Sequence, residues 1–547
     1  MTRDWIGTMS EKTQENGEGQ SFDPAWAKMV AAGHPSHIRV NAGNSAGHRH
    51  PAHIPMGPSE KRDSDQPHSI PPVEGNTIQP HDPLAGLTKT SSATSKAEIL
   101  DDLFLLYAAK PTDNPLASAF ERKFSVHAMG NGEGSLPTEE LPLAFSDMFQ
   151  EKLIGPVVLY IHIPFCSNQC IYCGFRGISA KSGQIQPYVN ALLKELQWIG
   201  RTNAAESTIL AVSFGGGTPS VLDPEMLATI VRTVKDNFNL ANDCELSLEG
   251  CVRDFTPERS EAFVNAGFNR FSLGVQSFDS DIRHSIGRMS DRDTVIANMS
   301  HLIGLDMGAV VLDLIYGLPG QSVSMFLDDI ALAEGLGVDG LDTYQLNVFP
   351  GGELDQALRN GKLPPVAPLQ DQGRYYEQAA DMMQAKRWRQ ISLSHFAMTY
   401  RERNLYNPVA KRQGNCIGCG AGAGGCLNGW SYYRPPAVPR YMAMAEADVF
   451  TPVAVMLPSS ARRIVSELIG QVEMGFLEPD YFRRRLAIDL SDLDPIFRNW
   501  EAAGLLIDTS KRYELTRAGQ FWGVNISHAL VKIINVLART GNNDNDG

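Results

Sequence analysis

Short apolar runs and longer amphipathic stretches alternate through the middle of the chain, between residues 156 and 350. The runs have the length of strands, and the stretches between them repeat their apolar residues with a helical period. Runs that are apolar throughout are typical of strands buried on both faces of a sheet. The pattern predicts strands at residues 157–163, 209–214, 245–249, 270–276, 309–315 and 340–346.

Six strand–helix units in succession predict an α/β fold with a parallel sheet and helices outside it. Periodicity alone does not distinguish a partial (β/α)6 barrel from a doubly wound sheet. In both arrangements the ligand site lies at the carboxyl ends of the strands. We therefore expect functional residues in the loops that follow the six strands.

The segment before these units has a different composition. Residues 1–94 are poor in apolar residues and rich in Pro, Ser, Gly and His, so they cannot bury enough surface to offset the entropy of ordering, and we expect disorder. Seven of the 13 histidines fall here. Such a tract can bind metal or heme, but solvated histidines without a role are the simpler interpretation. Residues 95–154 are predicted to form helices at 97–109 and 138–152.

The segment after the units is predicted to have two parts. Residues 351–454 extend the barrel and carry a glycine-rich loop that we expect to face the substrate. Residues 455–547 indicate three helices and then a small hairpin, as in a winged-helix domain, which by itself suggests DNA binding. The net charge of −14 argues against a nucleic-acid partner, because such partners require a basic surface.

Targeting signals are not evident in the sequence. No apolar run has the length of a transmembrane helix, and the first residues, MTRDWIGTMSEKTQ, form no apolar signal segment. All eight cysteines suit a reducing compartment. We therefore expect a cytoplasmic protein without a membrane span.

The most informative stretch, LYIHIPFCSNQCIYCGF at residues 159–175, begins in the first strand. Cys166, Cys170 and Cys173 follow that strand with the spacing C-x3-C-x2-C. Three close thiolates can hold three irons of a [4Fe–4S] cluster and leave the fourth iron open to a small molecule. Zinc prefers four ligands, commonly in C-x2-C pairs, and no fourth ligand lies nearby. A disulfide is disfavoured because the chain has no secretory features.

This motif, with Tyr172 inside its last interval, resembles the signature of radical S-adenosylmethionine (SAM) enzymes. The longer string resembles the branch that contains oxygen-independent coproporphyrinogen III oxidase, the heme chaperone HemW and the anaerobic heme-degrading proteins HutW and ChuW. The resemblance covers roughly residues 155–530. It implies a partial (β/α)6 radical SAM barrel at 155–350, a winged-helix-like α+β cap, a [4Fe–4S] cluster on the three cysteines, and SAM as cofactor.

The resemblance also implies a SAM site at the other strand ends. The segment GGGTPS at residues 215–220 resembles the one that contacts the methionine moiety of SAM, and glycines let a backbone approach a ligand closely. An arginine suits the SAM carboxylate, and an aspartate inside an apolar strand requires a partner. The cofactor-binding residues implied in this way are Gly215, Gly216, Gly217, Thr218, Glu249, Gln276, Arg288 and Asp313.

Tyr160 and Asp313 are the candidate catalytic residues. Tyr160 and His162 are alternate strand residues and point the same way, which places Tyr160 near the SAM pocket, but a core aromatic is an equal alternative. Cys244 and Cys251 flank Glu249, and we expect ordinary core or loop residues there.

Two differences from the motifs of related proteins indicate which branch of the family the chain resembles. Phe175 stands where coproporphyrinogen oxidases proper have a fourth cysteine, which favours HemW or HutW/ChuW. The glycine run 418–425 looks more like HutW/ChuW than the GLGPGAHS-type loop of HemW. The resemblance then implies a heme or related tetrapyrrole substrate that is methylated, opened and stripped of iron, with electrons from a flavodoxin-type donor.

Four alternatives stay open. A HemW-like chaperone would bind and deliver heme without porphyrin chemistry, and a coproporphyrinogen oxidase would decarboxylate its substrate. His395 is either a heme ligand or a buried, satisfied histidine. Cys416, Cys419 and Cys426 form either a second metal site or plain thiols in a glycine-rich loop.

Overall fold

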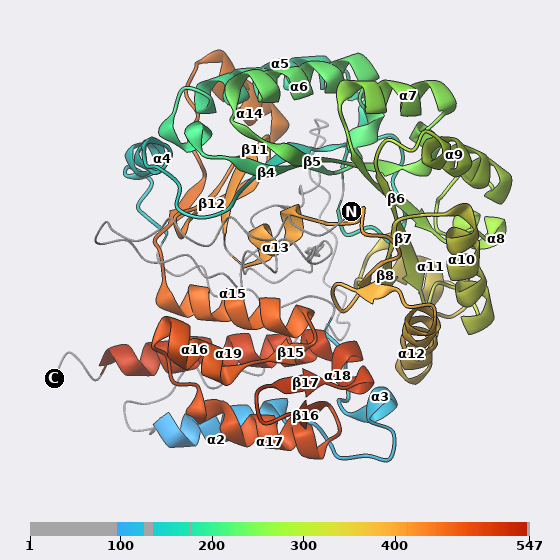
Figure 1. Cartoon of the computed structure of the whole chain (residues 1–547), viewed down its shortest axis with the longest axis vertical. Coiled ribbons are helices and arrows are strands. Elements are labelled where there is room, and N and C mark those ends of the chain that lie inside the picture. Colours follow the sequence, from blue (N-terminus) through green and yellow to red (C-terminus); the bar gives the residue numbers. More distant parts are fainter. Residues whose placement is uncertain (1–95, 125–134, 176, 413, 544–547) are drawn as a thin grey trace, which may run out of the picture.

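The computed structural model describes residues 96–124, 135–175, 177–412 and 414–543 (Figure 1). The predicted extension of residues 1–94, with its histidines, lies outside the described residues. Within them, no helix is long and apolar enough to cross a membrane.

The central part of the main sheet consists of parallel strands that neighbour one another in chain order. A doubly wound sheet would reverse its strand order at a switch point, so the uninterrupted order confirms the barrel-type arrangement. Two of the strands have the bounds that the apolar runs predict. The strands are β1 (Val157–Ile163), β4 (Ile209–Gly216), β5 (Leu240–Cys251), β6 (Arg270–Gln276), β7 (Ala309–Tyr316) and β8 (Gly340–Gln345).

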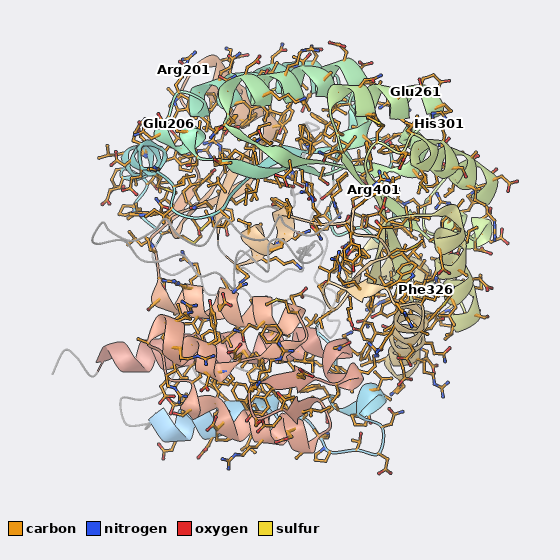
Figure 2. The ribbon with its side chains drawn as sticks, in the orientation of Figure 1. Arg201, Glu206, Glu261, His301, Phe326 and Arg401 are labelled. Carbon is orange, nitrogen blue, oxygen red and sulfur yellow. The ribbon has the colours of Figure 1, made fainter. Side chains whose placement is uncertain are left out.

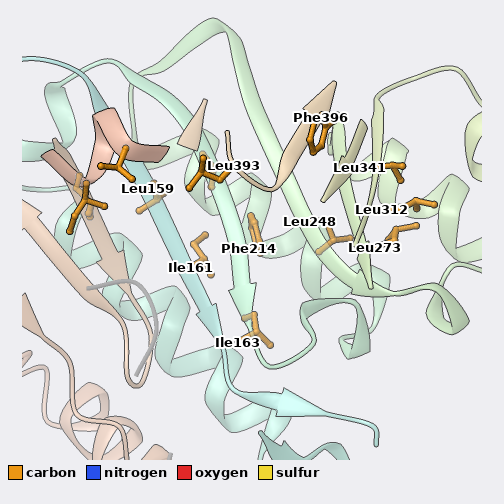
Figure 3. Packing of buried hydrophobic residues seen from close by; sticks show 14 of the residues in the cluster. Leu159, Ile161, Ile163, Phe214, Leu248, Leu273, Leu312, Leu341, Leu393 and Phe396 are labelled. Carbon is orange, nitrogen blue, oxygen red and sulfur yellow. The ribbon is translucent and has the colours of Figure 1, made fainter. Parts of the chain in front are cut away.

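The outer face of this sheet is apolar and covered by helices. Ile161, Phe214 and Leu248 are register neighbours on β1, β4 and β5, and their side chains are fully buried (Figure 3). Leu312 and Leu341 continue the layer on β7 and β8. Burial of a side chain of this size contributes roughly 1.5–3 kcal/mol, so this layer anchors the barrel.

The inner face is polar. One row of register neighbours runs from Tyr160 through Ser213 and Ser247 to Arg270. A second row runs through Gly274, Asp313, Asp342 and His395. Because strand side chains alternate between the two faces, the residues between the apolar anchors are the ones available to a site.

Most outer helices start where the sequence gives a start signal. A Ser, Thr or Asp side chain accepts a hydrogen bond from the first turn and satisfies one of its free N–H groups. Two of these helices also contact each other through polar side chains. His301 Nε2 on one helix lies 3.4 Å from Glu261 Oε1 on the other, and Figure 2 shows both side chains at the outer surface. The helices with such caps are α6 (Pro224–Asn237, after Asp223), α7 (Pro257–Ala266, after Thr256), α9 (Arg292–Gly304, after Asp291) and α10 (Val323–Leu336, after Ser322).

The segment 351–454 divides between the two edges of the sheet. The short strands β9 (Arg389–Gln390) and β10 (His395–Ala397) pair beyond β8. At the other edge β11 (Asn415–Cys419) pairs in parallel with β1 and is followed by three antiparallel strands. These strands are β12 (Gly424–Leu427), β13 (Trp430–Tyr433) and β14 (Ala454–Met456).

The glycine run of this segment contacts protein rather than a cavity. A Cβ added to Gly418 would lie 2.0 Å from the Gly424 carbonyl oxygen, and one on Gly425 would lie 2.2 Å from the Tyr432 ring. A Cβ on Gly420 would lie 2.5 Å from the Tyr188 hydroxyl. The close approach of strands β11 and β12 accounts for these glycines, and the expectation that their loop faces the substrate stays a prediction.

The C-terminal part has the predicted order of three helices and then a hairpin. Helix α15 (Ser460–Glu473) contacts α13 (Tyr406–Lys411), and α13 in turn contacts β1, β4 and β11. Lys411 Nζ lies 3.1 Å from Glu473 Oε2, and both side chains are buried. Helix α2 (Lys96–Tyr107) packs against this part of the chain and lies with it at the bottom of Figure 1. The remaining elements are α16 (Pro479–Leu486), α17 (Asp494–Ala502), β15 (Phe476–Leu477), β16 (Leu506–Asp508), β17 (Tyr513–Leu515), α18 (Arg517–Phe521) and α19 (Gly523–Asn543).

Candidate active site

The motif cysteines lie together on the wall of one cavity. Cys166 ends the short strand β2 (Phe165–Cys166), which pairs with β3 (Ile178–Ser179). Cys170 and Cys173 lie on the next turn, where the Cys173 N–H donates to the Cys170 carbonyl at 3.0 Å. All three side chains line the cavity and are half-buried. The fold thus brings the thiols together as their spacing predicts.

These thiols fit a [4Fe–4S] cluster better than a single ion. Within the described part of the chain, no three His, Cys, Asp or Glu side chains close on one point as the ligands of one metal ion do. In a cubane each thiolate binds a different iron. Burial raises the pKa of the Cys166 thiol to about 11, although a hydrogen bond donated by Thr218 lowers the pKa in part. A thiolate here is therefore favoured only beside a positive centre such as iron.

The glycine-rich segment after β4 packs on the cluster loop. The Thr218 N–H donates to the Phe165 carbonyl at 2.8 Å, and a Cβ on Gly217 would lie 2.6 Å from that oxygen. Gly216 has a φ of +116°, which favours glycine. Gly216, Gly217 and Thr218 line the cavity, whereas Gly215 lies outside its lining.

Arg288 joins the cluster loop to the end of β5. Its Nε and Nη2 donate to the Tyr172 hydroxyl at 3.3 and 2.9 Å, and its Nη1 lies 3.0 Å from Cys251 Sγ. At the rim, Arg253 donates to the Ser167 hydroxyl. The cavity wall therefore carries guanidinium groups beside the thiols, an arrangement suited to an anionic ligand group.

Glu249 lines the cavity, and Tyr160 lies behind it. A Cβ added to Gly215 would lie 3.0 Å from both Glu249 Oε1 and Tyr160 Cε2. Tyr160 is fully buried, with its hydroxyl 3.2 Å from His162 Nδ1 and its ring 5.7 Å from that of Tyr406. This position suits a core aromatic as well as a site residue, so the catalytic role of Tyr160 stays a prediction.

Gln276 ends β6 in an unusual conformation. Its φ is +72°, and the pairing with β7 shifts register between Gly274 and Gln276. The side chain is fully buried, yet neither polar atom has a hydrogen-bond partner among the described residues. Buried polar groups are normally hydrogen-bonded, so this side-chain amide is suited to bind a hydroxyl group of a ligand. Asp313 is 1% exposed and pairs with Gly274 in register, and its SAM-site role stays a prediction.

His395 is a fully buried histidine that lies between two carboxylates. Its Nδ1 lies 3.0 Å from Asp342 Oδ2 and its Nε2 lies 3.2 Å from Glu402 Oε1. Burial lowers the pKa of His395, but the two carboxylates outweigh it and raise the pKa to about 9. Arg270 also pairs with Glu402. A charged imidazole with both nitrogens engaged has no lone pair for iron, so the heme-ligand alternative is wrong for this arrangement.

Cys416, Cys419 and Cys426 do not converge. Cys416 and Cys426 are register partners on β11 and β12. Cys416 lies in the cluster of buried residues that includes Tyr160, whereas Cys419 belongs to the main core. Cys416 and Cys419 therefore face different parts of the core, and the three buried thiols fit core cysteines better than a second metal site.

The sequence pattern does not identify two of the residues that line the cavity. Cys251, expected to be an ordinary residue, lines the cavity beside Arg288, whereas Cys244 is buried in the core as expected. Arg283 also lines the cavity. Neither belongs to a motif, because the fold of the loops after β5 and β6 sets both positions.

Comparison with known proteins gives the same picture. The model of the radical SAM superfamily matches residues 160–333. The chain is 38% identical over 416 residues to anaerobilin synthase of Escherichia coli O157:H7, an alignment that covers 75% of this chain and 92% of that protein. It is 26% identical over 376 residues to the heme chaperone HemW of Bacillus subtilis (strain 168), covering 68% and 98% of the two chains.

The solved structure of coproporphyrinogen III oxidase (HemN) from Escherichia coli, a radical SAM enzyme, has the same fold. It superposes with a TM-score of 0.62 at 22% identity and covers 73% of this chain and 94% of that chain. The similarity confirms the predicted α/β architecture.

Proposed function

Since the chain belongs to the radical SAM superfamily, in the family of anaerobilin synthase, we propose that it breaks down heme without oxygen. The observation that carries the proposal is the alignment with anaerobilin synthase over 92% of that protein's length. The cavity formed by the cluster loop and the glycine-rich segment supports it. Phe175 in place of a fourth cysteine supports heme chemistry over porphyrinogen decarboxylation.

The described residues have distinct proposed roles. Cys166, Cys170 and Cys173 hold the [4Fe–4S] cluster, which with SAM supplies one-electron reductive cleavage of a sulfonium. Arg288 binds the SAM carboxylate through its guanidinium, and Gln276 offers its free amide to the ribose hydroxyls. Gly216, Gly217 and Thr218 give the methionine end close access to backbone N–H groups, and Glu249 accepts the amino group. Asp313 lies on the same inner face of the sheet.

The substrate is heme or a related tetrapyrrole. A methyl group from SAM is added, the macrocycle opens and the iron is released. Radical chemistry requires a site from which water is excluded, and the three cysteines proposed to hold the cluster line a cavity and are half-buried. Low-potential electrons come from a flavodoxin-type donor, and the eight free cysteines suit the reducing cytoplasm.

The test is anaerobic turnover with reconstituted cluster, SAM, a strong reductant and heme. Loss of the Soret band together with a linear tetrapyrrole establishes heme breakdown. A Soret band that persists while SAM is slowly cleaved contradicts the proposal and favours a HemW-like chaperone. Carbon dioxide release from coproporphyrinogen would instead favour the oxidase.

A further inference from the structure

Arg283 is a buried arginine whose hydrogen bonds go to backbone carbonyls. It lies on α8 (Ser280–Ser285), is 1% exposed and lines the same cavity as Arg288. Buried arginines elsewhere in the chain pair with carboxylates, as Arg434 does with Glu195 at 2.5 Å. Among the described residues no carboxylate lies within 4 Å of the Arg283 guanidinium nitrogens. Burying a charge without an opposite charge beside it is costly. The hydrogen bonds that compensate the Arg283 guanidinium therefore indicate what the residue does.

The guanidinium donates to three backbone carbonyls. Nη1 donates to the carbonyls of Val275 at 2.6 Å and Ser277 at 3.0 Å, and Nε donates to that of Ser290 at 2.7 Å. The first two carbonyls flank Gln276, the residue with a φ of +72°. A non-glycine residue rarely adopts such a conformation, and it persists only where the surroundings determine it. Arg283 therefore holds the peptide group that precedes Gln276 and the one that joins Ser277 to Phe278.

The same side chain also fixes the loop that carries Arg288. Ser290 follows Arg288 by two residues, and the Arg288 N–H donates to the Arg283 carbonyl at 2.8 Å. The guanidinium of Arg283 therefore connects the bulge at Gln276 with the loop at Arg288. These two segments carry the expected ribose and carboxylate ligands of SAM: Arg288 and Gly274 line the cavity, and Gln276 lies two residues after Gly274, outside the lining.

We propose that Arg283 is the positioning residue of the SAM site, setting the geometry of Gln276 and Arg288 together. The inference rests on the SAM-dependent function proposed above but not on the identity of the tetrapyrrole. Asp329 on α10 supports the same turn from the other side, since its carboxylate accepts from the Ser277 hydroxyl at 2.7 Å and the Phe278 N–H at 3.0 Å.

Charge supports this assignment. Burial, and then the like charge of Arg288, lower the pKa of Arg283 to about 10. Arg288 likewise has a phenol and a thiol as partners rather than a carboxylate. The cavity lining also carries Arg253, Glu249 and Glu353, and an anionic occupant beside Arg283 and Arg288 relieves the repulsion between these two cations. The SAM carboxylate and a thiolate-bound cluster are such groups.

The experiment compares SAM affinity in the full-length protein with reconstituted cluster and no heme. Arg283→Met is expected to keep wild-type iron content and to bind SAM about tenfold more weakly or worse, a change of about 1.4 kcal/mol. Its reduced cluster should show a smaller EPR change on addition of SAM. Arg283→Lys keeps the charge but cannot hold three carbonyls in one plane, so it should recover only part of the affinity.

Arg434→Met is the matched control, because it removes a buried arginine distant from the cavity. It should lower the melting temperature and leave SAM affinity unchanged. The proposal is overturned if Arg283→Met binds SAM within about twofold of wild type, or if Arg434→Met weakens SAM binding to the same extent.

A second variant covers the case in which Arg283→Met does not fold. Asp329→Asn should weaken SAM binding by a smaller factor, and unchanged affinity in both Asp329→Asn and Arg283→Lys would overturn the proposal. A wild-type protein that binds SAM but leaves heme intact would contradict the proposed function while leaving this test unaffected.

Discussion

The guanidinium of Arg288 donates two hydrogen bonds to the hydroxyl of Tyr172. Tyr172 stands between Cys170 and Cys173, so the aromatic residue inside the cluster motif fixes an arginine that we expect to bind SAM. The motif therefore shapes two sites at once. The cysteines are the proposed ligands of the cluster, and Tyr172 fixes the Arg288 guanidinium beside them.

The first prediction concerns this contact. Tyr172→Phe removes the acceptor of both hydrogen bonds and should weaken SAM binding by about 0.5–1.5 kcal/mol, roughly 2- to 10-fold, with unchanged iron content. Equilibrium dialysis with labelled SAM measures the effect. Tyr376→Phe, which loses a hydroxyl that donates to the Leu393 carbonyl, is the control. Equal SAM affinity of Tyr172→Phe and wild type would show that the contact does not position Arg288.

The second prediction concerns the cluster. Cys170→Ala removes one of three thiolate ligands and should abolish turnover and the cluster absorbance after reconstitution. Cys244→Ala, a core cysteine outside the cavity, should retain both. Iron and sulfide analysis of the two variants gives the answer. A Cys170→Ala protein that turns over heme would mean that the cluster lies elsewhere.

The third prediction concerns pH. The pKa of His395 is raised to about 9 from 6.5, so its stabilisation is complete below about pH 6.5 and is lost as pH rises through 9. The melting temperature should fall over that window. His395→Gln should be less stable at pH 6.5 by roughly 3–5 kcal/mol, because it leaves buried carboxylates unpaired.

The pH dependence is the discriminating readout for His395. The variant should show a flatter decline of melting temperature between pH 6.5 and 9 than wild type. An identical decline would show that His395 does not titrate in this network. A changed Soret spectrum of bound heme in His395→Gln would reinstate the heme-ligand alternative.

The fourth prediction compares a glycine that close strand packing requires with a glycine that has open space around its Cα. Gly418→Ala would place a Cβ 2.0 Å from the Gly424 carbonyl oxygen, and overpacking of this kind costs about 1–3 kcal/mol or more. Gly335 lies inside α10 with nothing within 4 Å of an added Cβ, so Gly335→Ala should stabilise by about 0.5–1 kcal/mol. Thermal melting of both variants measures this, and a stable Gly418→Ala would contradict the strand packing.

Much of the barrel is predictable because its signals are local. The apolar runs give the bounds of β1 and β6, and alternation identifies which residues face inward. The cysteine spacing gives the cluster loop, since all three ligands lie within eight residues of one another. Pro and Asp or Ser at helix starts act over one turn.

The remainder depends on contacts between distant residues. His395 meets Asp342 and Glu402 only after β8, β10 and the following loop come together. The glycine run is compatible with ligand approach and with strand packing, and only the neighbouring backbone distinguishes them. Gln276 shows no sequence signal for its positive φ, because the residues around it are held by Arg283 and Asp329, which lie outside the strand.

The most direct test of heme breakdown uses SAM labelled with deuterium on its methyl group, incubated anaerobically with the reconstituted protein, reductant and heme. Mass spectrometry of the products should show a linear tetrapyrrole that is heavier by the labelled methyl group, with release of iron in step with loss of the Soret band. Recovery of intact, unlabelled heme while SAM is cleaved would contradict the account and leave a protein that binds heme without breaking it.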